Sequence, residues 1–343
     1  MTHPPPLSRD RLLQLIQRMK TSRVVVIGDI MIDRYLYGDT DRLSPEAPVP
    51  VVTVHDRTAK LGGAANVAAN VASMGASCLL VGTVGDDGDG AAIRQELVVA
   101  RLDGRHVVTV AGRPTTSKTR IIARSQQIVR IDDEVDALLE GPDLDRLIRS
   151  ASEALADADA LLLEDYNKGT LTPTLITEVM ALARRRGIPV VVDPKYRQFF
   201  AYAGATVFKP NRRELESALG AAVDLQNRNA IPEVLARLKV DNLLVTLGAD
   251  GMLLVMKDGG SLGIPSIARQ VFDVSGAGDT VTAWLGTALA AGASLVEAAQ
   301  LANYAAGVEV GKPGVATVSP EEVLAVHEEQ FDQIGRLRRG GVI

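Results

Sequence analysis

The stretch Asp273-Val-Ser-Gly-Ala-Gly-Asp279 is followed directly by a helical run over residues 280–291. Gly276 and Gly278 carry no Cβ, so the backbone there can approach an anion closely. The first amides of the following helix have no acceptor within the helix, and the positive end of the helix dipole lies behind them. The stretch therefore predicts an anion-binding turn at the start of a helix.

The carboxylate of Asp279 is unexpected beside such a turn, because it repels phosphate. It has a function there if it accepts a hydroxyl proton and aims the oxygen at phosphorus, as phosphoryl transfer requires. A simpler interpretation is that Ser275 or Asp279 caps a helix after a glycine turn. Taken alone, the stretch leaves both interpretations open.

A second stretch, rich in glycine and alanine, covers residues 61–75 and leads through a strand-like segment, 77–84, into Gly85-Asp-Asp-Gly-Asp-Gly90. Together with the first stretch it resembles the two signature motifs of the ribokinase/PfkB family of carbohydrate kinases. The resemblance extends from Gly28 to about Ser319. It implies an α/β, ribokinase-like fold, in which a mostly parallel central sheet is flanked by helices and a small β-sheet forms a lid.

The composition agrees with one large domain over residues 1–343. The chain is 46% apolar, enough to bury a sizeable core, and its net charge of −5 argues against nucleic acid as a partner. One cysteine, Cys78, excludes an internal disulfide. The N-terminus lacks the apolar core of a signal peptide, and no apolar segment is long enough to span a bilayer. These features predict a cytoplasmic protein without a membrane partner.

Short β-branched runs alternate with longer helical patterns, which predicts parallel strands joined by helical crossovers. The predicted buried strands are residues 24–27, 78–81, 160–163, 190–192, 207–208 and 243–246. The predicted helices are residues 64–74, 144–155, 175–186, 212–219 and 230–238.

Two segments break this rhythm, residues 49–54 and 116–131. They are rich in β-forming residues, alternate with polar ones and have no crossover helix, so we predict antiparallel strands outside the main sheet. The family resemblance implies that a lid formed by about residues 34–60 and 110–132 covers the sugar and mediates a homodimer contact.

In open parallel sheets, ligands bind at the carboxyl ends of the strands. Asp33 follows the first predicted strand, and a carboxylate can accept hydrogen bonds from two adjacent hydroxyls. The resemblance assigns Asp33 and Asn66 to the sugar, with Gly62 and Gly63 letting the backbone close in. The alternative for Asp33 is a loop carboxylate at a turn.

Two further strand ends, Glu164-Asp-Tyr-Asn-Lys-Gly169 and Asp193-Pro-Lys195, each deliver a carboxylate and a lysine. Lys118 and Arg120 are two apart on a predicted lid strand, so their side chains share a face. Such cations favour a sugar that already carries a phosphate. Alternatively, the lid cations are solvated, or the lysines pair with neighbouring aspartates. The candidate substrate residues of these segments are Lys118, Arg120, Asp165, Lys168, Asp193 and Lys195.

Asn211 and Glu214 match the family's Asn-x-x-Glu element, which implies contact with phosphate and, through water, with Mg²⁺. The same spacing fits an ordinary helix capping box. The resemblance also implies that Asp273 and Ser275, with the loop 311–314, hold an activating K⁺. By resemblance, the remaining contacts of the adenine nucleotide are Thr246, Gly248, Gly251 and Asn303.

The resemblance makes Asp279 the catalytic base and Gly276, Ala277 and Gly278 the anion hole. Within the family, Leu43-Ser-Pro-Glu-Ala-Pro-Val-Pro50, Lys118-Thr-Arg120 and Asp165-Tyr-Asn-Lys-Gly169 look most similar to the D-glycero-β-D-manno-heptose-7-phosphate kinase branch. That branch implies ATP-dependent phosphorylation of the anomeric O1 to the 1,7-bisphosphate, towards ADP-heptose and the lipopolysaccharide core.

Two alternatives stay open. One is a kinase for another phosphosugar, such as fructose 1-phosphate or tagatose 6-phosphate, and the other is a non-catalytic sugar or nucleotide sensor. Many relatives carry a fused nucleotidyltransferase module. No nucleotide-transfer histidine pair follows the kinase region here, so we expect the kinase alone.

Overall fold

The computed structural model describes residues 4–124, 126–224, 231–268 and 270–339. Within these residues, nine strands form one large sheet in the order β13-β12-β11-β10-β9-β8-β1-β4-β5. Its strands are β1 (Arg23–Gly28), β4 (Ser77–Gly85), β5 (Val107–Val110), β8 (Ala160–Glu164), β9 (Val190–Asp193), β10 (Val207–Phe208), β11 (Leu243–Thr246), β12 (Met252–Val255) and β13 (Ser261–Ile264). Neighbours pair in parallel from β5 to β11, whereas β12 and β13 add an antiparallel edge.

Helices cover both faces of this sheet, because successive side chains of a buried strand point to opposite sides. Val24 and Val26 of β1 join one apolar cluster, and Val25 and Ile27 join the other. The first cluster lies under α1 (Arg9–Met19), α2 (Ala64–Ser73), α3 (Gly88–Val99), α8 (Ala277–Ala290), α9 (Leu295–Glu309) and α10 (Pro320–Arg339). The second lies under α4 (Gly141–Leu155), α5 (Pro173–Arg186), α6 (Arg212–Leu219) and α7 (Ile231–Leu238).

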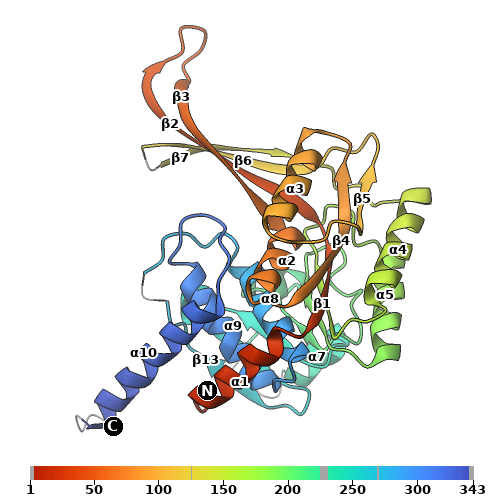
Figure 1. The fold of residues 1–343 in the computed structure, drawn as a ribbon, viewed down its shortest axis with the longest axis vertical. Coiled ribbons are helices and arrows are strands. Elements are labelled where there is room, and N and C mark those ends of the chain that lie inside the picture. Colours follow the sequence, from red (N-terminus) through yellow and green to blue (C-terminus); the bar gives the residue numbers. More distant parts are fainter. Residues whose placement is uncertain (1–3, 125, 225–230, 269, 340–343) are drawn as a thin grey trace.

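A smaller sheet projects from the carboxyl-end side of the large one, at the top of Figure 1. In the described residues it has four strands in the order β3-β2-β6-β7, namely β2 (Ile30–Leu43), β3 (Pro50–Gly63), β6 (Thr116–Ala123) and β7 (Gln126–Asp133). We call this sheet the lid. The outer pairs are antiparallel as predicted, but the central pair, β2 with β6, is parallel, which corrects the expectation of antiparallel pairing throughout.

The predicted strands and helices are present, most with ends unchanged or shifted by a few residues; Ala230, the first residue of the predicted helix 230–238, lies outside the described residues. The segment predicted over 49–54 is part of the longer β3, and the segment predicted over 116–131 contains two strands, β6 and β7. Two boundaries differ. β2 begins at Ile30, so Asp33 lies in a lid strand and not in a loop, and Val110 ends β5 of the large sheet. The antiparallel strands β12 and β13 were not predicted, because an edge hairpin has no crossover helix to mark it.

In the part of the chain that the structure describes, no helix combines the length and the hydropathy that a membrane span needs.

Candidate active site

Asp279 is the third residue of α8, which begins after Gly276 in a left-handed conformation with φ 95°. This conformation is unfavourable for residues with a Cβ, and a Cβ at Gly276 would lie 3.1 Å from Oε1 of Glu309 and 3.2 Å from Nδ2 of Asn66. Gly276 has no side-chain cap, and of the first-turn amides of α8 that of Ala277 makes a long hydrogen bond, 3.4 Å, to the carbonyl of Val274. The predicted glycine turn at the start of a helix is present, and its binding of an anion stays a prediction.

Two side chains from distant parts of the chain hold the carboxylate of Asp279. Nδ2 of Asn66, on α2, donates to Oδ2 at 2.7 Å, and the hydroxyl of Tyr166, after β8, donates to Oδ1 at 2.8 Å. Asn66 is oriented in turn by Asn70, whose Nδ2 donates to its Oδ1. Asn66 was predicted to contact the sugar, but the structure uses its amide to orient Asp279. Tyr166 was missed, although it lies inside the polar run that ends β8.

Burial raises the pKa of Asp279 to about 6, and the charge of Asp193 adds to this effect. The hydrogen bonds from Asn66 and Tyr166 and the charge of Lys209 oppose it. A carboxylate with a pKa near neutrality is a stronger base than an ordinary aspartate and is still ionised at pH 7. The arrangement therefore suits Asp279 to accepting a proton.

Two further carboxylates lie behind Asp279 at the ends of neighbouring strands. Glu164 of β8 and Asp193 of β9 are direct partners in the parallel register. Nζ of the buried Lys209 lies 2.8 Å from Oδ2 of Asp193, so this predicted substrate residue has a lysine partner within the protein. Glu164 is fully buried and neither of its oxygens accepts a hydrogen bond from a described residue, so burial and the charges of Asp193 and Asp279 hold its pKa well above its ordinary value. One oxygen from each of Glu164, Asp193 and Asp279 lies within 4.8 Å of the others, a spacing that could hold a metal ion.

The carboxylate of Asp29 holds the backbone of the loop that carries Tyr166. This buried carboxylate accepts hydrogen bonds from the backbone amides of Tyr166, Lys168 and Thr170 at 2.8, 3.0 and 3.1 Å. Asp165 points the other way and accepts from the hydroxyl of Tyr202 at 2.7 Å. The side chain of Asp165 is thus used inside the core, and its contact with the substrate stays a prediction.

On the lid side, Asp33 forms a buried ion pair with Arg120, whose guanidinium lies over the ring of Tyr35. A Cβ at Gly62 would collide with the carboxylate of Asp33, so glycine is needed there as predicted. Arg120 was expected to hold a phosphate together with Lys118. The structure instead uses its charge to neutralise Asp33, because the two side chains meet across the pair of strands β2 and β6.

Lys118 and Lys168 are brought together, although Lys118 lies on the lid and Lys168 on the body. Nζ of Lys118 lies 2.9 Å from Oε2 of Glu134, and Nζ of Lys168 lies 2.6 Å from Oε1 of the same carboxylate. Both ammonium groups therefore contact one carboxylate, and together they define an anion-sized position between the lid and the body. Glu134, directly after β7, was not predicted to take part.

Lys195 lies elsewhere. It forms an ion pair with Glu214, and its Nζ lies 5.2 Å from the centre of the Tyr166 ring. Burial lowers its pKa, but Asp193 and Glu214 outweigh this and raise the pKa to about 12, so Lys195 stays charged. We had expected Lys195 to hold the distal phosphate beside the lid cations; its contacts instead join it to the nucleotide-side residue Glu214.

Asn211 and Glu214 form the capping box that the spacing allowed. The amide of Glu214 donates to Oδ1 of Asn211 at 2.8 Å, and the amide of Asn211 donates to Oε2 of Glu214 at 2.9 Å. The two polar side chains are therefore fixed at the start of α6, where they face the end of β11.

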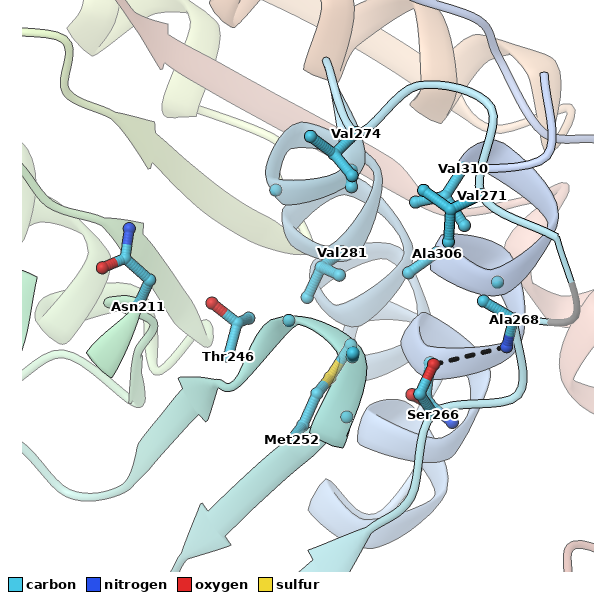
Figure 2. Close-up of a pocket in the computed structure, with 17 residues that line it drawn as sticks. Asn211, Thr246, Met252, Ser266, Ala268, Val271, Val274, Val281, Ala306 and Val310 are labelled. Atoms are coloured by element: carbon cyan, nitrogen blue, oxygen red, sulfur yellow. Dashed lines mark hydrogen bonds between the residues drawn. The ribbon is translucent and has the colours of Figure 1, made fainter. Parts of the chain in front are cut away.

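A pocket of about 380 Å³ opens between β11, β12 and the helices α8 and α9. Figure 2 shows Val271, Ala306 and Val310 together at one end of it and Asn211 at the other. The predicted nucleotide residues Asn211, Thr246, Gly248, Gly251 and Asn303 all line this pocket, as do Ala277 and Gly278 of the anion-binding turn. An apolar slot that ends at a helix N-terminus suits a flat aromatic base attached to phosphates.

The segment before the turn lies against the loop after α9. The amides of Phe272 and Asp273 donate to the carbonyl of Val310, and Oδ1 of Asp273 accepts from the amide of Ser275 at 2.9 Å. Glu309, at the end of α9, is fully buried and neither of its oxygens has a hydrogen-bond partner among the described residues. Burial, together with the charges of Asp279 and Asp273, raises its pKa to about 8. No local pattern in the sequence pointed to Glu309.

The chain is similar to proteins from several bacteria. It is 43% identical over 322 residues to the bifunctional protein HldE of Rhodospirillum rubrum, covering 93% of this chain and 65% of that protein. It is 44% identical to the protein of the same name from Geobacter sulfurreducens, with 93% and 65% covered, and 41% identical to that of Trichlorobacter lovleyi, with 98% and 69% covered. The chain thus spans about two thirds of the length of these relatives.

Solved structures share the fold. The ribokinase of Arabidopsis thaliana complexed with ribose and ATP is 22% identical, with a TM-score of 0.70 over 90% of this chain and 99% of that one. Phosphofructokinase-2 from Escherichia coli in complex with potassium is 19% identical, with a TM-score of 0.73 over 90% and 98%. These identities are low, so the likeness supports the ribokinase-like fold alone.

A family model, described as pfkB family carbohydrate kinase, matches residues 21–322. This match confirms the resemblance that the two glycine-containing stretches indicated. The site combines a buried carboxylate at a helix N-terminus with an apolar pocket, an arrangement that suits phosphoryl transfer. The chain is therefore a carbohydrate kinase that belongs to the pfkB family.

Proposed function

We propose that the protein transfers the γ-phosphoryl group of ATP to the anomeric O1 of D-glycero-β-D-manno-heptose 7-phosphate and so forms the 1,7-bisphosphate, a step towards ADP-heptose and the lipopolysaccharide core. The observation that carries this proposal is the convergence of Lys118 and Lys168 on one anion-sized position. A neutral sugar needs no such pair, whereas a phosphate dianion gains a charge-assisted contact from each lysine. The similarity to the HldE proteins and the motifs shared with the heptose-7-phosphate kinase branch favour heptose as the sugar.

In the proposed reaction, Asp279 accepts the proton of O1 while O1 attacks the γ-phosphorus. The O1–P bond forms as the bond between the γ-phosphorus and the bridging oxygen breaks, and ADP leaves. Tyr166 and Asn66 hold the carboxylate in one orientation, and the amides of residues 276–278 take up the charge that grows on the phosphoryl oxygens. Asp33, neutralised by Arg120, would accept hydrogen bonds from sugar hydroxyls.

The nucleotide would place its adenine at the apolar end of the pocket and its phosphates towards Asn211 and the start of α8. Asn211 and Glu214 would hold Mg²⁺ through water, and the ion would neutralise charge on the β- and γ-phosphates when bound. Lys195, paired with Glu214, would add a fixed positive charge to the same region. Asp273 and Ser275, beside the loop 311–314, would hold K⁺, and the potassium complex of phosphofructokinase-2 from Escherichia coli supports this by analogy.

We also propose that the protein acts in the cytoplasm as a homodimer that uses the lid. Val129 and Ile131 of β7 support this, since 45% and 54% of their surfaces are exposed. Exposed apolar side chains on an edge strand suit pairing with a second copy. The relatives are named bifunctional, and the proposal concerns the kinase reaction only.

The pKa of Asp279 predicts how the rate depends on pH. A base must be ionised, and a pKa of about 6 means that the active carboxylate is lost as the pH falls through 6. This pKa belongs to the enzyme without substrate, so we expect kcat/KM for the sugar to fall at least about tenfold for each pH unit below 6 and to be nearly constant between pH 7 and 8. The measurement is kcat/KM for the sugar at saturating ATP, with the pKa of the sugar phosphate determined separately because substrate phosphates also titrate near pH 6. A constant kcat/KM down to pH 5 would contradict the assignment of Asp279.

The substrate is tested by measuring ADP release from purified protein with Mg²⁺ and ATP. The sugars compared are heptose 7-phosphate, unphosphorylated heptose, fructose 1-phosphate, fructose 6-phosphate, tagatose 6-phosphate and ribose. We expect kcat/KM for heptose 7-phosphate to exceed that of every other sugar by about tenfold or more. Preference for another phosphosugar would keep the mechanism and replace the substrate, and no turnover with any sugar would favour the sensor.

A further inference from the structure

The carboxylate of Glu134 forms a bridge between the lid and the body. It pairs with Lys118 from β6 and with Lys168 from the loop after β8. The two lysine side chains are 15% and 16% exposed, and that of Glu134, at 29%, reaches solvent. The ammonium groups of both lysines hold the pKa of Glu134 below its ordinary value, despite the opposing effect of burial. Glu134 is therefore an anion at neutral pH, at the point where the two cations meet.

We infer that Glu134 occupies the position of the substrate's distal phosphate in the sugar-free enzyme and is displaced when a phosphosugar binds, an inference that rests on the proposed function. A phosphate dianion and a carboxylate cannot occupy the same contacts with the two lysines, because both are negatively charged and each would need the space in which the two ammonium groups converge. Glu134 therefore competes with the substrate for both cations.

The backbone around Glu134 allows such an exchange by side-chain rotation alone. Nη2 of Arg113 donates to the carbonyls of Val135, Ala137 and Lys168, which fixes the segment after Glu134 to the loop that carries Lys168. The chain thus stays in place while the glutamate side chain turns outward, where 29% of it already meets solvent. Rotation of a partly exposed side chain costs little compared with movement of a pinned loop.

The exchange also gives selectivity. A sugar with a phosphate replaces both ion pairs of Glu134 with stronger contacts, since bonds to phosphate are charge-assisted on both sides. A neutral sugar has no anionic group to replace the carboxylate of Glu134, so Glu134 stays paired with the two lysines and fills the space between them. Glu134 would therefore act as a specificity-determining residue that rejects unphosphorylated sugars.

Glu134→Gln tests this inference, because it keeps the shape of the side chain and removes its charge. We expect the KM for heptose 7-phosphate to fall about fivefold with kcat changed less than about twofold, since exposed or partly exposed ion pairs are worth at most about 1 kcal/mol each. Asp133→Asn is the matched control. It removes the same charge one residue away, on an exposed side chain that points to the other face of β7, and should change KM less than about twofold.

A second measurement does not depend on the identity of the sugar. Inorganic phosphate is titrated by calorimetry into each variant with the nucleotide site filled by a non-hydrolysable ATP analogue and Mg²⁺. We expect Glu134→Gln to bind phosphate about fivefold more tightly than the wild type. If heptose 7-phosphate is not turned over but this difference is found, the proposed substrate fails and the role of Glu134 stands.

The opposite outcome identifies Glu134 as a support that orders the two lysines. In that case Glu134→Gln would raise the KM for heptose 7-phosphate and weaken the binding of inorganic phosphate, and the inference would be overturned. Unchanged values in both measurements would overturn it equally. Glu134→Ala, which removes the whole carboxylate, should shift both values in the same direction as Glu134→Gln.

Discussion

Asp279→Asn is expected to lower kcat by about 10²-fold or more while both KM values stay within about threefold of the wild type. The amide has nearly the same shape as the carboxylate and can still accept a hydrogen bond from Tyr166 or Asn66, so the site should keep its geometry. It has no basic oxygen, however, and cannot take the proton of O1. Because phosphoryl transfer depends mainly on positioning and charge, a residual rate should remain.

The measurement is kcat and KM from ADP release, with thermal unfolding to show that the variant folds. Asp145→Asn is a suitable control, because Asp145 is exposed on α4 and has no part in the site. It removes one carboxylate from the same protein without touching the reaction. Turnover close to the wild type in Asp279→Asn would exclude Asp279 as the base.

Replacing both Lys118 and Lys168 by glutamine is expected to lower kcat/KM for heptose 7-phosphate by about 10²-fold or more. Each lysine would lose a charge-assisted contact to the distal phosphate, and hydrogen bonds to charged groups are worth about 1.5–3 kcal/mol each. The loss should fall on KM, because the distal phosphate is bound equally in the ground state and in the transition state.

Two controls separate phosphate binding from general damage. Unphosphorylated heptose should lose no kcat/KM in the double variant, since it makes no contact with the lysines. Lys257→Gln, on an exposed turn between β12 and β13, should leave all values unchanged. An equal loss of kcat/KM for the neutral and the phosphorylated sugar would contradict the assignment of the two lysines.

The local features of the sequence predicted much of the fold. The buried strands β1, β4, β8, β9 and β11 were recognisable because a short all-apolar run flanked by turn residues is typical of a strand that is covered on both faces of a sheet. The turn before α8 was recognisable because glycine at a left-handed position is a local requirement of the backbone. The capping box of Asn211 and Glu214 was visible for the same reason.

The pairing of charged side chains was not predictable in this way. Asp165 and Tyr166 are adjacent, yet one turns into the core towards Tyr202 and the other reaches Asp279. Lys118 and Arg120 share a strand face as predicted, but their partners are different carboxylates, Glu134 and Asp33. The partner of each charged side chain depends on which side chain from a distant part of the sequence lies within a few ångströms of it.

The sequence by itself thus determined the family, most of the strands and helices of the large sheet, and the glycine turn before α8. These follow from backbone conformation and apolar burial, which act over a few neighbouring residues. Only the tertiary structure decided that Asn66 and Tyr166 hold the carboxylate of Asp279, that Arg120 neutralises Asp33, and that Glu134 joins Lys118 to Lys168. The physical reason is that ion pairs and hydrogen bonds between side chains form across space between segments that lie far apart along the chain, so no local pattern encodes them.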